Sequence, residues 1–175
     1  LLGLCPLRYD MLLLLSHISG AGHAPTSATE FVQNFLQVAP LAAGQHLYSS
    51  THNHLWGRRE ARQLESIAVD PEAPSLPYPR WFGLDRFSGP PRIASWILAT
   101  DNIQASLARL SPEFGTPVRL ERGAYTWDIS VSDTGDLPFG CYGPALLEWQ
   151  PPSHPCPHLP YSCWRLISGE GLLSA

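Results

Sequence analysis

The sequence has little charge of either sign and no apolar run of membrane-spanning length. Charged residues make up 15% of the 175 residues, and the 11 Lys and Arg residues are scattered rather than clustered. Nothing therefore resembles the basic surface of a nucleic-acid-binding protein or a polybasic membrane patch. The apolar run at residues 11–15 is too short to cross a bilayer. We expect neither nucleic-acid nor membrane partners.

Cysteine and the common catalytic signatures are also sparse. The four cysteines, Cys5, Cys141, Cys156 and Cys163, are too few for a disulfide scaffold, so reduced thiols and a cytoplasmic location are expected. The chain has no Ser-His-Asp order, phosphate-binding glycine loop or dinucleotide-binding fingerprint. The sequence therefore gives no indication of a serine hydrolase or of a nucleotide-binding enzyme.

The sequence does have the material for a sizeable core. Its residues are 44% hydrophobic, with six Trp and six Phe, which bury a large area per residue. The 18 Pro and 14 Gly predict short elements bounded by turns. At this length the chain suits one domain, or two small modules that share a core.

Two segments show the same order of elements: a strand, a helix and three strands. Each helix is predicted from a capping-box pattern, Ser27-x-x-Glu30 or Asp101-x-x-Gln104, followed by apolar residues at helical spacing. The expected elements are strand 12–19, helix 28–37 and strands 46–50, 52–56 and 62–69, then strand 93–99, a helix from about residue 101 and strands 117–122, 125–132 and 144–150.

This order predicts an α+β fold of two βαβββ modules that form an open, barrel-like mixed sheet around a cleft. The predicted modules are residues 11–70 and 92–150, joined by a Pro-rich connection at 71–91. We expect residues 1–10 to lie outside the fold. Residues 151–175 form a tail with one strand candidate at 164–167. A connection as long as 71–91 is often functional.

Seven short motifs run through the chain in one order. They are Leu15-Ser16-His17-Ile18, Thr51-His52-Asn53-His54-Leu55, Leu64-Glu65 with Ile67–Pro71, Arg80–Asp85, Trp96 with Thr100-Asp101, Leu147-Glu148-Trp149, and Cys163 with Arg165–Ser168. In this order they make the chain similar to the glyoxalase-like domain of the vicinal oxygen chelate superfamily. The resemblance implies paired βαβββ modules and a small-molecule ligand in the cleft, where the wider superfamily holds a divalent metal.

The resemblance also implies a ligand set from the first and last strand of each module. Residue by residue it assigns His17, Glu65, Trp96 and Glu148 to these positions. The indole of Trp96 cannot ligate a metal, which leaves one imidazole and two carboxylates. Such a triad suits Zn, Mn, Fe or Ni, with open positions for water or substrate. The metal would act as a Lewis acid, with Glu65 or Glu148 as the catalytic base.

Glu65 raises a question even without the resemblance. It lies inside an apolar strand, where a buried and unpaired carboxylate costs several kcal/mol or changes its protonation state. A metal is one answer. The alternatives are that Glu65 faces a wet cleft, pairs with Arg62, Arg92 or Arg165, or binds a ligand by hydrogen bonds without a metal.

Two histidines and two tryptophans are further candidates for substrate binding. His52 and His54 alternate along their predicted strand, so they share one face of it. Trp81, in the long connection, is a candidate for a lid, and Trp96 is a candidate for a stacking surface. An exposed polar strand face and ordinary core packing are the alternative interpretations of these residues.

A second potential metal cluster occurs in the tail. His154, Cys156, His158 and Cys163 lie within ten residues, but their spacing matches none of the usual structural zinc patterns. The family resemblance accounts for Cys163 as the start of a strand. We therefore treat a zinc site in the tail as the weaker alternative.

Three hypotheses follow from the sequence. The first is a glyoxalase-like enzyme that uses a metal for isomerase, lyase or dioxygenase chemistry on a small oxygen-rich molecule. The second is a metal-free protein that binds or sequesters a small molecule, which Trp96 favours. The third is a decayed or truncated relative that is stable only as a homodimer. Departures from the family pattern at Ser16, Gln63 and Ser66 favour this third hypothesis.

Overall fold

The computed structural model describes residues 13–46, 51–58, 62–72, 74–151 and 159, without the side chains of 42–46, 52–54, 57, 58 and 62. Its elements are β1 (Leu14–Ala21), α1 (Pro25–Leu36), β2 (Leu41–His46), β3 (Thr51–Arg58), β4 (Arg62–Val69), η1 (Trp81–Arg86), β5 (Arg92–Ala99), α2 (Ile103–Leu107), η2 (Pro112–Phe114), β6 (Thr116–Arg122), β7 (Tyr125–Val131), α3 (Pro138–Cys141) and β8 (Ala145–Trp149).

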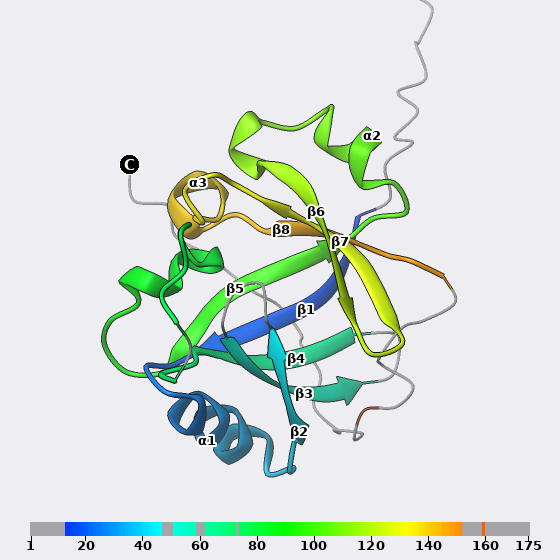
Figure 1. Cartoon of the computed structure of the whole chain (residues 1–175). Coiled ribbons are helices and arrows are strands. Elements are labelled where there is room, and N and C mark those ends of the chain that lie inside the picture. Colours follow the sequence, from blue (N-terminus) through cyan, green and yellow to red (C-terminus); the bar gives the residue numbers. More distant parts are fainter. Residues whose placement is uncertain (1–12, 47–50, 59–61, 73, 152–158, 160–175) are drawn as a thin grey trace, which may run out of the picture.

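The eight strands form one mixed sheet in the order β2-β3-β4-β1-β5-β8-β7-β6 (Figure 1). Each half of this order is a βαβββ module whose first and last strands are parallel neighbours, β1 with β4 and β5 with β8. The halves meet where β1 pairs with β5 in antiparallel orientation. The predicted α+β fold of two modules in an open, barrel-like sheet is thereby confirmed.

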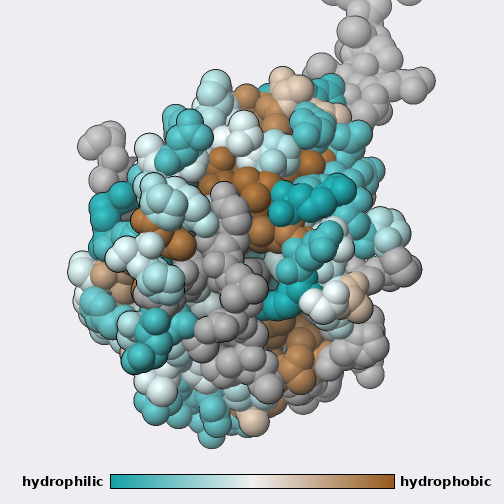
Figure 2. Space-filling model, viewed as in Figure 1, coloured by the Kyte–Doolittle hydropathy of each residue, from teal (hydrophilic) through white to brown (hydrophobic). Residues whose placement is uncertain are grey.

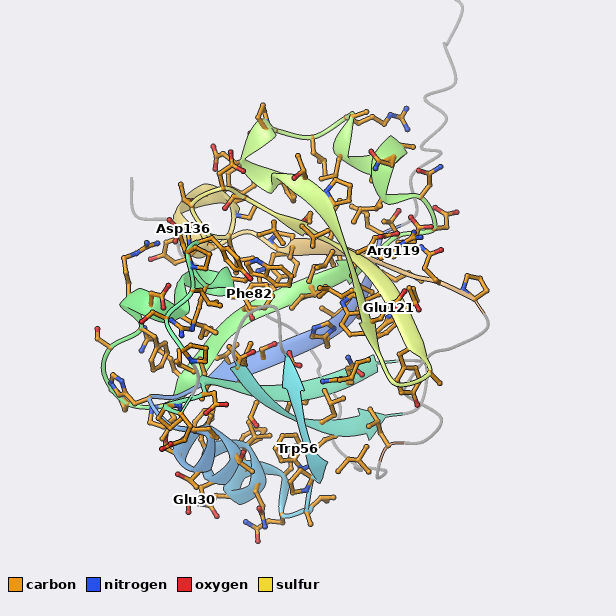
Figure 3. The ribbon with its side chains drawn as sticks, in the orientation of Figure 1. Glu30, Trp56, Phe82, Arg119, Glu121 and Asp136 are labelled. Carbon is orange, nitrogen blue, oxygen red and sulfur yellow. The ribbon has the colours of Figure 1, made fainter. Side chains whose placement is uncertain are left out.

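Side chains alternate between the two faces of the sheet, so even-numbered and odd-numbered residues of β4 lie on opposite faces. Leu64 packs in the cluster beneath α1, and Ser66 Oγ lies 3.1 Å from Thr29 Oγ1 of that helix. Gln63, Glu65 and the other odd-numbered neighbours point to the opposite, inner face. Trp56, labelled in Figure 3, is buried with Val32 and Leu36 on the α1 side.

The helix α1 begins three residues earlier than predicted. Its N-cap is Ala24, Pro25 occupies the first helical turn, and Ser27 takes the N3 position rather than the cap. Ser27 Oγ accepts from the Ala24 backbone N–H at 3.2 Å and donates to the Ala24 carbonyl at 2.9 Å. Proline is favoured in this first turn because its missing N–H has no helical partner there.

The strand predicted at 46–50 was placed too late, since β2 spans Leu41–His46. Gly44 lies within this strand, beside a register irregularity between Leu41 and Gly44 in the pairing with β3. Glycine is tolerated at such irregularities because a bulge relaxes the demand for a regular strand. Residues 47–50, the remainder of the predicted strand, lie outside the described residues.

No helix in the described part of the chain has the length and apolar character needed to cross a bilayer.

We predict that Gly115→Ala strongly destabilises the second module. Gly115 has φ +72°, and a Cβ there would lie 1.9 Å from the carbonyl oxygen of Val131. Because backbone atoms cannot move aside cheaply, we expect a loss of about 2–4 kcal/mol in the free energy of unfolding, measured by urea denaturation.

Gly123→Ala is the matched control. Gly123 has φ +60° but nothing within 4 Å of an added Cβ. Only the backbone conformation is disfavoured, so a loss of about 1 kcal/mol is expected. Equal losses in the two variants would contradict the steric explanation for Gly115.

Candidate functional site

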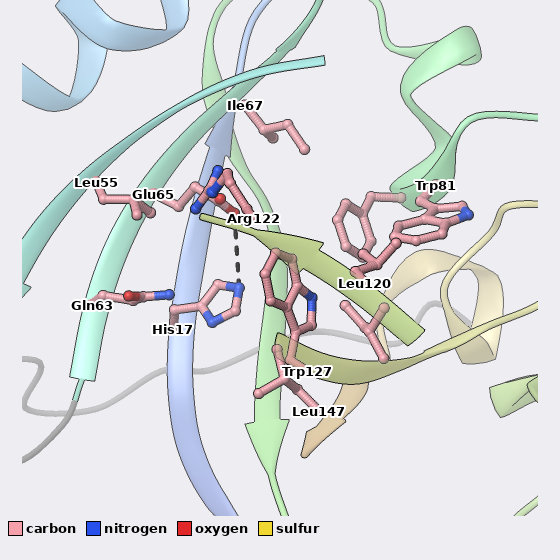
Figure 4. Close-up of a pocket in the computed structure, with 12 residues that line it drawn as sticks. His17, Leu55, Gln63, Glu65, Ile67, Trp81, Leu120, Arg122, Trp127 and Leu147 are labelled. Carbon is pink, nitrogen blue, oxygen red and sulfur yellow. Dashed lines mark ion pairs between the residues drawn. The ribbon is translucent and has the colours of Figure 1, made fainter. Parts of the chain in front are cut away.

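A pocket of about 460 Å³, measured out to its open mouth, lies on the inner face of the sheet beside η1 (Figure 4). Its lining includes charged, polar and aromatic side chains from both modules. The lining residues are His17, Leu55, Gln63, Glu65, Ile67, Trp81, Phe82, Leu120, Arg122, Trp127, Ile129 and Leu147. The pocket is thus polar on the side of β1 and β4 and largely apolar on the other.

His17 and Glu65 form the centre of the polar side. Their side chains are nearly buried, and His17 Nε2 lies 3.8 Å from Glu65 Oε2. Ser19 Oγ donates to the same carboxylate oxygen at 2.9 Å, and Ser16 Oγ lies 3.2 Å from His17 Nδ1. These contacts explain how a carboxylate tolerates this strand, because an imidazole and a hydroxyl replace the water lost on burial.

Gln63 and Arg122 complete the polar side, and sequence reasoning missed both as binding candidates. Gln63 is 8% exposed, and its Oε1 has no hydrogen-bond partner among the described residues. The same holds for Arg122 Nη1, a buried atom of a guanidinium that lies 5.8 Å from the centroid of the Trp127 ring. Buried polar atoms normally have partners, so these two atoms stand out on this side of the pocket.

The aromatic side is carried by η1 and β7. Trp81 and Phe82 come from η1, and Trp127 comes from β7 with its ring 5.4 Å from that of Trp149. Figure 2 shows hydrophobic side chains gathered near the middle of the viewed face, where β6 and β7 lie in Figure 1. A flat apolar body is the natural complement of such a wall.

The η1 segment is held in place by polar contacts at its ends. Arg80 donates to both carboxylate oxygens of Asp85, from its backbone N–H at 2.8 Å and from Nη1 at 2.7 Å. The Gly83 backbone N–H donates to the Gly135 carbonyl at 3.1 Å, and Arg86 pairs with Asp136. These contacts fix the turn that presents Trp81 to the pocket.

Glu148 is not brought to the His17–Glu65 pair. Leu147 lines the pocket, so Glu148, the next residue on β8, faces the other side of the sheet. There Glu148 Oε2 accepts a hydrogen bond of 2.8 Å from the backbone N–H of Ile103, at the start of α2. The expected shared site of one imidazole and two carboxylates therefore does not form.

Trp96 also lies away from the pocket. In the pairing of β1 with β5, His17 stands opposite Ile97, whereas Trp96 stands opposite Ile18 on the other face. The Trp96 side chain is exposed, and its Nε1 donates to the Tyr142 carbonyl at 3.0 Å. It is not among the residues that line the pocket, in contrast to Trp81.

The remaining predicted candidates lie beyond what the structure describes. His52 and His54 belong to β3, but their side chains are outside the described residues. The tail cluster of histidines and cysteines, residues 154–163, lies outside them as well, as does the predicted strand at 164–167.

A family model described as a glyoxalase-like domain matches residues 15–167. The chain belongs to this family. The resemblance inferred from the motifs is thereby confirmed for the domain. No curated protein matches the sequence at a significant level.

Solved structures with the same fold share little sequence with this glyoxalase-like chain. Methylmalonyl-CoA epimerase from Mycobacterium tuberculosis is 15% identical with a TM-score of 0.51, over 79% of this chain and 88% of its own. A Streptomyces coelicolor methylmalonyl-CoA epimerase variant in complex with 2-nitronate-propionyl-CoA is 13% identical with a TM-score of 0.52, over 78% and 92%. A hypothetical protein from Bacillus halodurans is 13% identical with a TM-score of 0.51, over 81% and 96%.

The described residues of this glyoxalase-like domain do not fit the predicted metal triad. They contain no group of three or more His, Cys, Asp or Glu side chains arranged to hold a metal ion. Among the described residues, the pocket lining contains one imidazole and one carboxylate, and the guanidinium of Arg122 lines the same space. A dication there would lack the second carboxylate and would meet a fixed positive charge.

We predict that Asp85→Asn weakens the domain at neutral pH but not in acid. Burial alone would raise the pKa of Asp85, but the hydrogen bonds and charge of Arg80 outweigh it and hold that pKa below its ordinary value of 3.8. A lowered folded-state pKa stabilises the fold above the unfolded value, and this contribution disappears as the pH falls through the folded value. Since the carboxylate is partly exposed, we expect a loss of only about 0.5–1 kcal/mol at neutral pH.

Urea denaturation of the wild type and the variant at neutral and strongly acidic pH measures this difference. Asp133→Asn, at an exposed aspartate, is the control and should show no such pH-dependent gap. A gap for Asp85→Asn that is equally large in acid would contradict the assignment to the Arg80–Asp85 pair.

Proposed function

We propose that this glyoxalase-like domain binds a small oxygen-rich organic molecule in the pocket and that Glu65 transfers a proton on it. One observation carries the proposal: a buried carboxylate and imidazole, 3.8 Å apart, line a pocket together with Gln63 and Arg122, each of which has a buried polar atom with no partner among the described residues. Binding of the ligand requires only that its polar atoms match the polar groups of the pocket. Proton transfer requires in addition that the carboxylate reach a C–H or O–H of the ligand.

The polar side of the pocket supports the binding of oxygen atoms. Gln63 Oε1 offers an acceptor for a ligand hydroxyl, and Arg122 Nη1 offers a donor for a ligand carbonyl or acid oxygen. A ligand that satisfies both atoms removes two buried and unpaired polar groups, each of which costs on the order of 1–3 kcal/mol.

The arrangement of Glu65 suits a base that works on a carbon acid. Ser19 Oγ donates to Glu65 Oε2, and this hydrogen bond orients the side chain of the proposed base. On removal of a proton from a carbon next to a carbonyl, the electron pair moves to the carbonyl oxygen. His17 is placed beside Glu65 to donate a hydrogen bond to that oxygen, and the proton returns from Glu65 to carbon.

The fold of the relatives is compatible with this chemistry. Proteins with a TM-score near 0.5 to this chain include methylmalonyl-CoA epimerases, and an epimerase by its name inverts a stereocentre. At 13–15% identity they support the fold alone. The proposal for this chain therefore depends on Glu65 and His17 rather than on the neighbours.

We predict that Glu65→Gln abolishes proton transfer. The amide keeps the shape of the side chain but cannot accept a proton, so exchange should fall by roughly 100-fold or more. The measurement is proton NMR in D₂O of the α-hydrogens of pyruvate, 2-oxobutyrate and acetoacetate, with Trp fluorescence to report binding.

Glu148→Gln is the matched control, because Glu148 faces α2 rather than the pocket. Its exchange rate should stay within a few-fold of wild type, while the start of α2 is weakened by about 0.5–1 kcal/mol. Binding without exchange above the solvent rate would leave a sequestering protein and contradict the role of Glu65 as a base. Failure of the whole panel to bind would contradict the proposal.

Metal analysis provides a separate test of the first hypothesis from the sequence. After loading with Zn²⁺, Mn²⁺, Fe²⁺ or Ni²⁺ and dialysis, we expect substoichiometric metal. Among the described residues, the pocket lining has only His17 and Glu65 as ionisable metal donors, and it also holds Arg122. One equivalent that is retained by the wild type and lost in Glu65→Gln would restore the metal-dependent reading.

A further inference from the structure

Among the described residues that line the pocket, only Arg122 brings a fixed positive charge. It is the last residue of β6, paired across the hairpin with Tyr125, and its guanidinium carbon lies 5.8 Å from the centroid of the Trp127 ring. Within the described residues no ion pair joins Arg122 to a carboxylate. Its Nη1 is buried and has no hydrogen-bond partner among them.

Arg119, on the same strand, differs from Arg122 because it is paired with a carboxylate. Arg119 makes a bidentate pair with Asp128, with Nε–Oδ1 at 2.9 Å and Nη2–Oδ2 at 2.7 Å, and it is exposed (Figure 3). Arg119 and Arg122 point to opposite faces of β6, and only Arg122 lines the pocket. One arginine of β6 is thus satisfied by the protein, and the other is left for something that enters the cavity.

The residues around Arg122 indicate which kind of ligand would suit this part of the pocket. A guanidinium presents a planar fork of N–H donors that matches a carboxylate. Next to it, Leu120 and Trp127 form an apolar and aromatic wall, with Phe82 of η1 also in the lining. With a carboxylate bound, the pocket would hold two acidic groups, Glu65 and the ligand, against Arg122 and the imidazole of His17.

The geometry points to a small monocarboxylate with a flat apolar body as the ligand class of this pocket, its carboxylate held by Arg122 and its body against Trp127. This inference rests on the proposed function, since it names the molecules that the same site selects. It adds that the negative charge of the ligand, and not only its oxygen atoms, decides binding.

The test compares two probes of nearly the same shape that differ in charge, 4-fluorobenzoate and 4-fluorobenzamide. Fluorine NMR titration gives the dissociation constant of each for the wild type, Arg122→Gln, Arg122→Lys and Arg119→Gln. A hydrogen bond to a charged group corresponds to a preference of roughly 10- to 100-fold for the benzoate. Circular dichroism and thermal unfolding confirm that each variant is folded.

We expect the wild type and Arg119→Gln to prefer the benzoate, Arg122→Gln to lose this preference through weaker benzoate binding alone, and Arg122→Lys to keep part of it. Equal affinity of the two probes for the wild type would overturn the inference while leaving small-molecule binding intact. A preference that survives in Arg122→Gln would overturn the assignment to Arg122. Binding of neither probe at millimolar concentration would overturn the ligand class. If the panel of oxo acids also fails to bind, the proposed function falls with it.

Discussion

The strand β1 is paired on both sides, in parallel with β4 and in antiparallel orientation with β5, and this double pairing fixes the site. It sets His17 beside Gln63 on one neighbour and beside Ile97 on the other. It also sets Ser19 beside Glu65, so that the serine hydroxyl reaches the carboxylate. A slip of one residue would turn every one of these side chains to the opposite face.

The two modules contribute different chemistry to the one pocket. The first supplies the polar residues His17, Gln63 and Glu65 from β1 and β4. The second supplies Trp127 and the neighbouring apolar side chains, together with Arg122. Because the sheet curves, side chains from β1 and β4 and side chains from β6 and β7 line the same cavity. The pocket is therefore a property of the joined modules, and neither half contains it alone.

The second glutamate illustrates how one position on a strand decides between a structural and a functional role. Leu146, buried with Ile103 and Phe114, and Leu147, in the pocket, point to opposite faces of β8. Glu148 shares the face of Leu146, and there its carboxylate accepts from the first backbone N–H of α2. A negative charge is favoured at a helix start, where backbone N–H groups lack helical partners. This contact explains Glu148 without any ligand.

The sequence by itself determined the order of elements, the duplication of the βαβββ unit and the family, because strand and helix periodicities and turn residues are local signals. It also marked His17, Glu65 and Trp81 as candidates for the site. Only the tertiary structure decided which residues meet. The faces of β5 and β8 depend on the pairing of distant strands, and this pairing turns Trp96 and Glu148 away from the cavity. Arg122 and Gln63 carry no motif, and they stand out because folding buries polar atoms of both without giving them partners among the described residues.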